Sequence, residues 1–144
     1  MKFNKFLFYF LSFTWGCIMT VIGAIAAMAL IMAGYKPKKW GCCWYFEVGN
    51  GRWGGVNLGL VFVCNKNPSE HIKNHETGHA IQNCVFGPTM PFVIFIPSFV
   101  RYWYREFRKK IGKPCLSEYD SVWFESNATK TGTKFMERYA GVAK

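Results

Sequence analysis

The residues best suited to chemistry lie within five consecutive positions, His75-Glu76-Thr77-Gly78-His79. Residues four apart lie on one face of a helix, so the imidazoles of His75 and His79 can reach a single ion. Glu76 is turned about 100° from His75 and lies beside that ion, where a general base for hydrolysis belongs. The spacing therefore predicts a zinc ion bound by His75 and His79, with Glu76 as the catalytic base.

A catalytic zinc ion takes a third protein ligand, and the sequence offers three candidates for it. His71 precedes His75 by one turn, but His71 and His79 are about 12 Å apart along a helix axis, too far to share one ion. Glu125 follows two aromatic residues, an apolar setting in which an unpaired carboxylate is costly. Asp120 is a second carboxylate, although it also suits a helix start. The residues alone favour Glu125 and leave Asp120 open.

The helix that carries the histidines is predicted over residues 68–86. Asn67 suits its N-cap, Pro68 its first position, and Glu70 a capping-box carboxylate. The Gly87-Pro88 pair then ends it. Because this helix is polar through most of its length, we expect it in water or at an interface and not across a bilayer.

Other elements are predicted around that helix. Residues 43–48 and 56–63 are rich in β-branched and aromatic side chains and flank a glycine-rich loop, which predicts an antiparallel hairpin. A last helix, capped by Ser117 and weakened near Gly132, is expected to carry Glu125. Together these elements predict an α+β fold.

Two patterns can now be compared with known families. His75-Glu76-x-Gly78-His79, followed by Glu125-x-x-Ala128 on another predicted helix, resembles the gluzincin class of zinc metallopeptidases. A longer pattern is similar to an uncharacterised bacterial membrane-associated family over about residues 36–130. It adds Gln82, Phe86-Gly87-Pro88, Pro97-Ser98 and Tyr119-Asp120-x-x-Trp123.

The resemblance implies a minimal zincin-like fold: a β-hairpin, the histidine helix, an amphipathic helix and a third-ligand helix. It also implies zinc as the cofactor, with His75, His79 and Glu125 as ligands and Glu76 as the base. Gluzincins commonly carry an aspartate four residues after the ligand glutamate, to orient a ligand histidine. This chain has Thr129 there, so a hydroxyl or Asp120 is expected to supply part of that role.

The uncharged N-terminal run from Phe6 to Tyr35 predicts a membrane anchor. Its 30 residues exceed the roughly 20 that cross a bilayer and the roughly 7–15 of a signal-peptide core. Ala27-Met28-Ala29 has the form of a cleavage site, so a cleaved signal is the alternative. We therefore predict an anchor over residues 1–35 and a folded domain over residues 36–144. The lysines flanking the anchor on both sides favour a cytoplasmic domain only slightly.

A second apolar region follows the histidine helix. Residues 89–100 are uncharged and interrupted by prolines, which suits either buried core or a loop dipping into a membrane. Residues 98–113 predict an amphipathic helix with an aromatic stripe beside arginines and lysines. That helix lies either on a membrane surface or in solvent. Lipid contact through residues 89–113 is therefore one of two open interpretations.

Composition narrows the remaining function classes. The net charge is +10, but no nucleic-acid-binding motif accompanies it, so lipid headgroups are the simpler partner and nucleic acid is not expected. The six cysteines form no C-x-x-C pair, which excludes a zinc ribbon and a redox motif of that kind. Five of them fall outside the anchor, and this odd number argues against a full disulfide framework.

The sequence thus predicts a membrane-anchored zinc metallopeptidase that hydrolyses peptide bonds; it does not identify the substrate. Tyr102, Tyr104 and Tyr119 are candidates to stabilise an oxyanion, with no means of choosing among the seven tyrosines. The alternative is a membrane-associated interaction module with a structural zinc or a lost activity. A structural site is closed by a fourth protein ligand, and no cysteine near the motif obviously supplies one, which favours catalysis.

Overall fold

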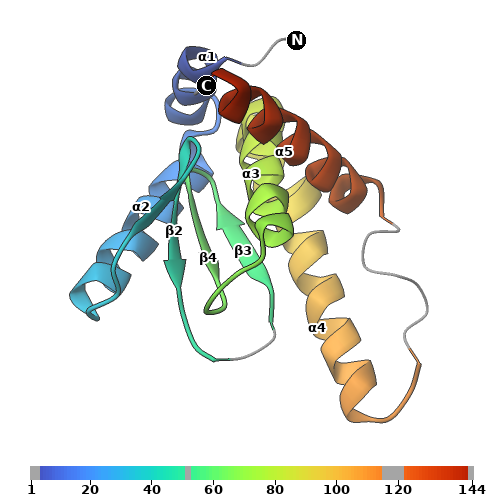
Figure 1. The fold of residues 1–144 in the computed structure, drawn as a ribbon. Helices are drawn as coiled ribbons and strands as arrows, with labels where there is room; N and C mark the ends of the chain where they lie inside the picture. The colour runs from blue at the N-terminus through green and yellow to red at the C-terminus, as the bar shows by residue number, and fades with distance from the viewer. Residues whose placement is uncertain (1–3, 51–52, 115–121, 143–144) are drawn as a thin grey trace.

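The computed structural model describes residues 4–50, 53–114 and 122–142, and within them the fold is α+β, as predicted (Figure 1). Five α-helices and a four-stranded mixed sheet make up the described part. The helices are α1 (Lys5–Phe13), α2 (Cys17–Met32), α3 (Glu70–Phe86), α4 (Ile96–Lys110) and α5 (Trp123–Val142). The strands are β1 (Lys38–Trp40), β2 (Cys43–Glu47), β3 (Gly55–Leu58) and β4 (Val61–Cys64). Two short helical turns, η1 (Gly87–Thr89) and η2 (Pro91–Phe95), join α3 to α4.

The sheet has the order β1-β2-β4-β3, which differs from the predicted hairpin. Strand β2 pairs with β4 in parallel, with Trp44 opposite Val61, and β3 pairs with β4 antiparallel, with Gly55 opposite Cys64. The prediction that residues 43–48 and 56–63 form one antiparallel hairpin is therefore wrong.

The apolar run 56–63 folds back on itself at one glycine. Gly59 has a φ of +75°, and its backbone N–H donates to Asn57 Oδ1 at 2.9 Å, which closes a tight turn. A Cβ at Gly59 would also lie 2.8 Å from the backbone nitrogen of Thr20 on α2. The run thus makes two strands, and β3 becomes an edge of the sheet.

Helix α3 begins two residues later than predicted. Its N-cap is Ser69, whose hydroxyl accepts from the Ile72 N–H at 3.3 Å. Asn67 lies outside the helix with a φ of +52°, and Glu70 is the first helical residue, so neither has its predicted capping role. The helix ends as predicted before Gly87, which has a φ of +53°.

The polar helix α3 is the buried centre of the fold, not an exposed one as its composition suggested. Ten of its residues between Asn74 and Cys84 are buried. Its polar side chains find partners on other elements: Trp40 Nε1 donates to Asn74 Oδ1 at 3.1 Å, and Asn83 Nδ2 donates to the Gly16 carbonyl at 3.0 Å. These partners lie far away in the sequence, so periodicity alone could not reveal the burial.

Helices α3 and α5 lie side by side with their backbones in close approach (Figure 1). A Cβ at Gly78 would lie 1.9 Å from the Ala128 carbonyl oxygen, and one at Gly132 would lie 1.8 Å from that of Asn74. The weak point predicted at Gly132 is therefore wrong, because the glycine lets α5 continue to Val142 against α3. The predicted cap Ser117 lies outside the described residues.

The N-terminal run is divided into α1 and α2, which packs against the domain. The break falls at Gly16, where a Cβ would meet the Asn83 side chain at 2.5 Å. Phe8 of α1 is fully buried in the main core, with its ring 5.7 Å from that of Phe135 on α5. Residues predicted to form a separate anchor therefore contribute to the core of the fold.

Among the described residues, no single helix has both the length and the apolar character to cross a membrane. Two helix pairs meet that test jointly, α1 with α2 across an 87° bend, and residues 70–89 with residues 91–110 across a 117° bend.

Residues 89–100 are helical, with one face in the core and the other exposed. Met90 and Ile94 are buried together with Met19 and Phe124, whereas Phe92 is 71% exposed. Helix α4 continues from this segment. It begins two residues before its predicted start and ends three residues before its predicted end. None of its residues is buried, and it projects away from the α3–α5 pair (Figure 1).

Candidate metal centre

Three side chains from two helices converge on one point. His75 and His79 come from adjacent turns of α3, and Glu125 comes from the first turn of α5. The two Nε2 atoms are 3.2 Å apart, and Glu125 Oε2 lies 3.1 Å from His75 Nε2 and 3.2 Å from His79 Nε2. This buried group can hold a metal ion, and it consists of the two histidines and the favoured third ligand of the sequence prediction. Asp120, the alternative ligand, lies outside the described residues.

The size of this triangle suits a metal ion. Ligand atoms about 2.0–2.1 Å from a tetrahedral zinc ion are about 3.3 Å from one another, close to the observed 3.1–3.2 Å. Glu125 is completely buried, and the side chains of His75 and His79 are only 12% and 8% exposed. Three electron-rich atoms at this spacing need protons or a cation between them.

Hydrogen bonds at Nδ1 hold both histidine rings so that their Nε2 atoms face the triangle. His79 Nδ1 lies 2.8 Å from Gln82 Oε1, an oxygen that can only accept, so Nδ1 carries the proton and Nε2 is left as a ligand. Gln82 is held in that orientation because its amide group donates to the Phe124 carbonyl at 2.7 Å and to Asn127 Oδ1 at 3.2 Å. Gln82 was part of the longer sequence pattern, but its orienting role was not predicted.

The corresponding partner of His75 is the hydroxyl of Thr129, at 2.8 Å from Nδ1. Thr129 stands where gluzincins commonly have an aspartate, and its hydroxyl makes the contact with a histidine that was expected there. Such outer contacts fix the ring orientation of a metal ligand. Both orienting residues lie one helical turn after a proposed ligand, Gln82 after His79 and Thr129 after Glu125.

Glu125 uses its two oxygens differently. Oε2 faces the histidines, while Oε1 accepts a hydrogen bond from the Ser98 hydroxyl of α4 at 2.5 Å. Burial alone would raise the pKa of Glu125, but in the metal-free protein the contacts with His75, His79 and the Ser98 hydroxyl outweigh it and hold that pKa well below its usual range. The carboxylate is therefore ionised, the form that binds a metal. The role of Ser98 was also missed from the sequence.

Glu76 lies beside the triangle but is not a corner of it. It is 4% exposed, and its Oε2 atom has no hydrogen-bond partner among the described residues. The pKa of Glu76 is raised to about 7, chiefly by burial and in smaller part by the nearby Glu125, against a lowering effect of His75. An unpaired buried carboxylate costs stability, and perturbed groups of this kind cluster at functional sites.

The backbone of β3 makes room for Glu76 and holds it. A Cβ at Gly55 would lie 2.6 Å from Glu76 Oε1, so a glycine is needed where β3 passes the carboxylate. Asn57 Nδ2 donates to the Glu76 carbonyl at 2.9 Å and thereby ties β3 to α3. Both residues belong to the glycine-rich and apolar segments that the sequence analysis assigned only to a hairpin.

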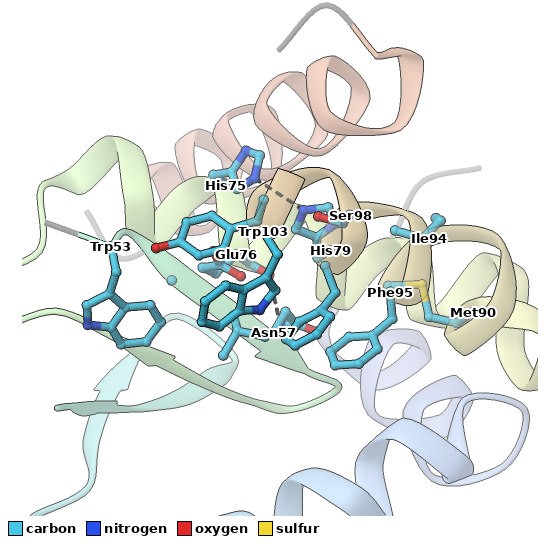
Figure 2. Close-up of a pocket in the computed structure, with 14 residues that line it drawn as sticks. Trp53, Asn57, His75, Glu76, His79, Met90, Ile94, Phe95, Ser98 and Trp103 are labelled. Atoms are coloured by element: carbon cyan, nitrogen blue, oxygen red, sulfur yellow. Dashed lines mark hydrogen bonds between the residues drawn. The ribbon is translucent and has the colours of Figure 1, made fainter. Parts of the chain in front are cut away.

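Two cavities open onto this centre. The first, of about 240 Å³, lies between β3 and the η2–α4 segment and is mainly apolar (Figure 2). The second, of about 290 Å³, is more polar. Both are lined by Trp53, Gly55, His75, Glu76 and Tyr102. The first is also lined by His79 and Ser98, so both histidines and Glu76 face it, whereas Glu125 does not line it.

The remaining candidates from the sequence differ in whether they line one of the two cavities. His71 is exposed and lines the second cavity, in agreement with its exclusion as a ligand and its expected place on the surface or the substrate side. Tyr102 lines both cavities, whereas Tyr104 lines neither. Tyr119 lies outside the described residues. Tyr102 is therefore the described tyrosine that can reach a substrate.

Comparison of the chain with protein-family models, with curated proteins and with solved structures finds no match. Its function is therefore inferred from the geometry of this centre.

Proposed function

We propose that the protein is a zinc metallopeptidase in which His75, His79 and Glu125 bind the metal and Glu76 is the catalytic base. One observation carries this proposal: three buried ligand atoms lie 3.1–3.2 Å apart, and two of their residues, His75 and His79, line a cavity together with the unpaired buried carboxylate of Glu76. A structural ion pair would account for the triangle, but it would give no reason for an unpaired Glu76 beside it.

The donor set favours zinc. Two imidazole nitrogens and one carboxylate oxygen are the ligand type of catalytic zinc sites, which keep one position open. Among the described residues, the metal-binding group has these three members and no fourth. The side of the group toward the cavity is lined by Glu76 and Tyr102, neither of which is a member. Among the described residues, none therefore takes a fourth position.

His75, His79 and Glu125 would hold the zinc ion, which would lower the pKa of a water molecule and polarise a carbonyl group. Glu76 Oε2 accepts the proton of the attacking water and then delivers it to the leaving amine. This role needs a carboxylate beside the metal that does not bind it, and Glu76 lies beside the metal-binding group without being a member of it. Tyr102 is assigned to donate a hydrogen bond to the oxygen on which negative charge develops.

The arrangement of β3 favours a peptide as the substrate. Strand β3 is an edge of the sheet, and Gly55, Val56 and Asn57 line the first cavity. An extended peptide can add to such an edge through backbone hydrogen bonds, which would bring a peptide bond beside Glu76.

The proposal includes membrane association through the N-terminal helices. Helices α1 and α2 expose large apolar side chains along their length, including Phe6, Phe13, Ile25 and Met32. Exposed apolar surface on this scale marks a contact with lipid or protein. The bend at Gly16 is compatible with lipid contact from one side as well as with a bent span.

Metal analysis and peptide cleavage with matched variants test the proposed function. We expect one zinc ion per full-length chain, lost in His75→Ala and in Glu125→Gln. Glu76→Gln should keep the zinc but lose about 10²–10⁴-fold in turnover, because the proton acceptor is gone. The control is Glu137→Gln, which changes an exposed carboxylate on α5. If His75→Ala abolished function and Glu76→Gln left it unchanged, the zinc would be structural and the peptidase proposal wrong.

A further inference from the structure

Helix α4 presents an apolar face that nothing in the described structure covers. Its large apolar residues recur at spacings of three and four, which places them on one side of the helix. They are Ile96, Phe99, Val100, Trp103 and Phe107, with Phe92 before the helix and Ile111 after it. Each is more than 40% exposed. A continuous apolar face of this length is a contact surface for lipid or protein.

The charges of α4 indicate which partner covers this face. Five of its fifteen residues are basic, namely Arg101, Arg105, Arg108, Lys109 and Lys110, and Glu106 is its one acid. Basic residues beside an apolar aromatic face are the pattern of a helix that lies in the headgroup region of an anionic membrane. The net charge of +10 acts in the same direction.

The apolar face of α4 continues into the first cavity. Phe99 and Trp103 line that cavity, yet they are 52% and 55% exposed, so they form its rim. Deeper in the cavity the wall is Phe95, Ile94 and Met90, the last two almost completely buried (Figure 2). The apolar face of α4 is therefore continuous with apolar side chains that line the same cavity as Glu76.

We propose that α4 lies on an anionic membrane surface and that the substrate is a membrane-bound polypeptide, which places a large apolar side chain in the first cavity from the lipid side. This inference rests on the proposed peptidase function and adds the class of its substrate. A segment held at the lipid surface reaches the metal centre along Phe99 and Trp103 without crossing bulk water. A segment in free solution gains no such guidance.

Contact of α4 with lipid is tested first, without any use of activity. The full-length chain is reconstituted in vesicles of phosphatidylglycerol and phosphatidylcholine, with and without brominated acyl chains. Bromine quenches the fluorescence of a tryptophan that touches the acyl chains. The quenching that is lost in Trp103→Phe is therefore the quenching of Trp103. We expect Trp103 to be quenched. Equal quenching of wild type and Trp103→Phe, or a dimer that buries α4, would overturn the proposal.

The substrate class is then tested with one peptide in two forms, free in solution and attached to an acyl chain. The double variant Phe107→Ser/Ile111→Ser changes the outer face of α4 and no cavity residue. We expect it to cut the anchored peptide about tenfold more slowly than wild type does, because two apolar contacts with lipid are lost. Cleavage of the free peptide and zinc content should stay unchanged. The control Trp44→Ser, at an exposed position of β2, should alter neither.

The outcomes separate the two proposals. Suppose that wild type cuts the free and the anchored peptide and that the double variant cuts each at the wild-type rate. The enzyme then does not use α4 to reach its substrate, so this inference is wrong while the proposed peptidase function is unaffected. If zinc-loaded wild type cuts neither form of a varied peptide set, the peptidase proposal itself fails.

Discussion

Replacement of Gly78 by alanine tests whether the contact between α3 and α5 sets the metal geometry. Gly78 lies between the two histidines, and a Cβ there would be 1.9 Å from the Ala128 carbonyl oxygen and 2.5 Å from its carbon. Contacts of a real Cβ are essentially never shorter than 3.0 Å. The obstacle is backbone, so no change of rotamer relieves it, and α5 must retreat by about 1 Å.

The size of the effect follows from the position of Ala128, one turn after Glu125. A retreat of about 1 Å carries the carboxylate away from the histidines, whereas metal–ligand distances tolerate only about 0.2 Å. We expect zinc affinity to fall by at least about 10–100-fold, the loss typical of damage to the outer shell of a site. Alanine by itself favours a helix by about 1 kcal/mol over glycine. Overpacking costs about 1–3 kcal/mol or more, so a net loss of stability is expected.

Competition with a chromogenic chelator measures the zinc affinity of Gly78→Ala, and thermal unfolding with and without zinc measures its stability. The control Lys130→Ala makes a change to alanine on the exposed side of α5 and should match wild type in both measurements. If Gly78→Ala bound zinc as tightly as wild type and unfolded at a higher temperature, the helix contact would not be what positions Glu125.

Two further changes address the surroundings of the metal. Thr129→Val removes the hydroxyl partner of His75 Nδ1 without changing the side-chain shape, and should weaken zinc binding about 10–100-fold, whereas Thr129→Ser should keep it; equal affinities in the chelator assay would contradict this. In metal-free protein, the pKa of Glu76 is raised to about 7, mainly by burial, whereas the unfolded chain loses this proton near pH 4.5. The contribution of Glu76 to the free energy of unfolding therefore declines as pH rises from about 4.5 to 7. The Glu76→Gln variant has no such pH dependence at this position. Denaturant unfolding should show that its free energy of unfolding exceeds that of wild type by near zero below pH 4.5 and by about 3 kcal/mol above pH 7. A difference that did not change with pH would refute the raised pKa of Glu76.

The candidate metal centre was largely readable from the sequence because its parts depend on local geometry. His75 and His79 share a helix face by their spacing alone, and the hydroxyl of Thr129 stands one turn after Glu125. The choice of Glu125 was a weaker prediction, because its approach to the histidines depends on packing between two helices. That packing follows from Gly78 and Gly132, whose close backbone contacts appear only in three dimensions.

The sheet and the N-terminal region were predicted less well because their determinants are distant contacts. A single glycine in an apolar run, Gly59, turns the chain, and strand pairing across the sheet leaves no local signal. The uncharged N-terminal run is similarly interrupted at Gly16, which packs against Asn83 on α3. Hydrophobicity predicts that such a segment avoids water, but it does not show where the segment bends.

The burial of polar α3 explains how the site is held ready for a metal. Its buried amides are bonded to different elements: Asn74 to Trp40 of β1, Asn83 to Gly16 before α2, and Gln82 to Phe124 of α5. A helix held only by apolar contacts can rotate or slide at small cost, whereas each of these bonds is lost if α3 shifts. The polar character that suggested an exposed helix therefore fixes its rotation and register. With Gln82 and Thr129 orienting the histidines, the ligand atoms are placed by the protein's own contacts, which is the preorganisation that a catalytic metal site requires.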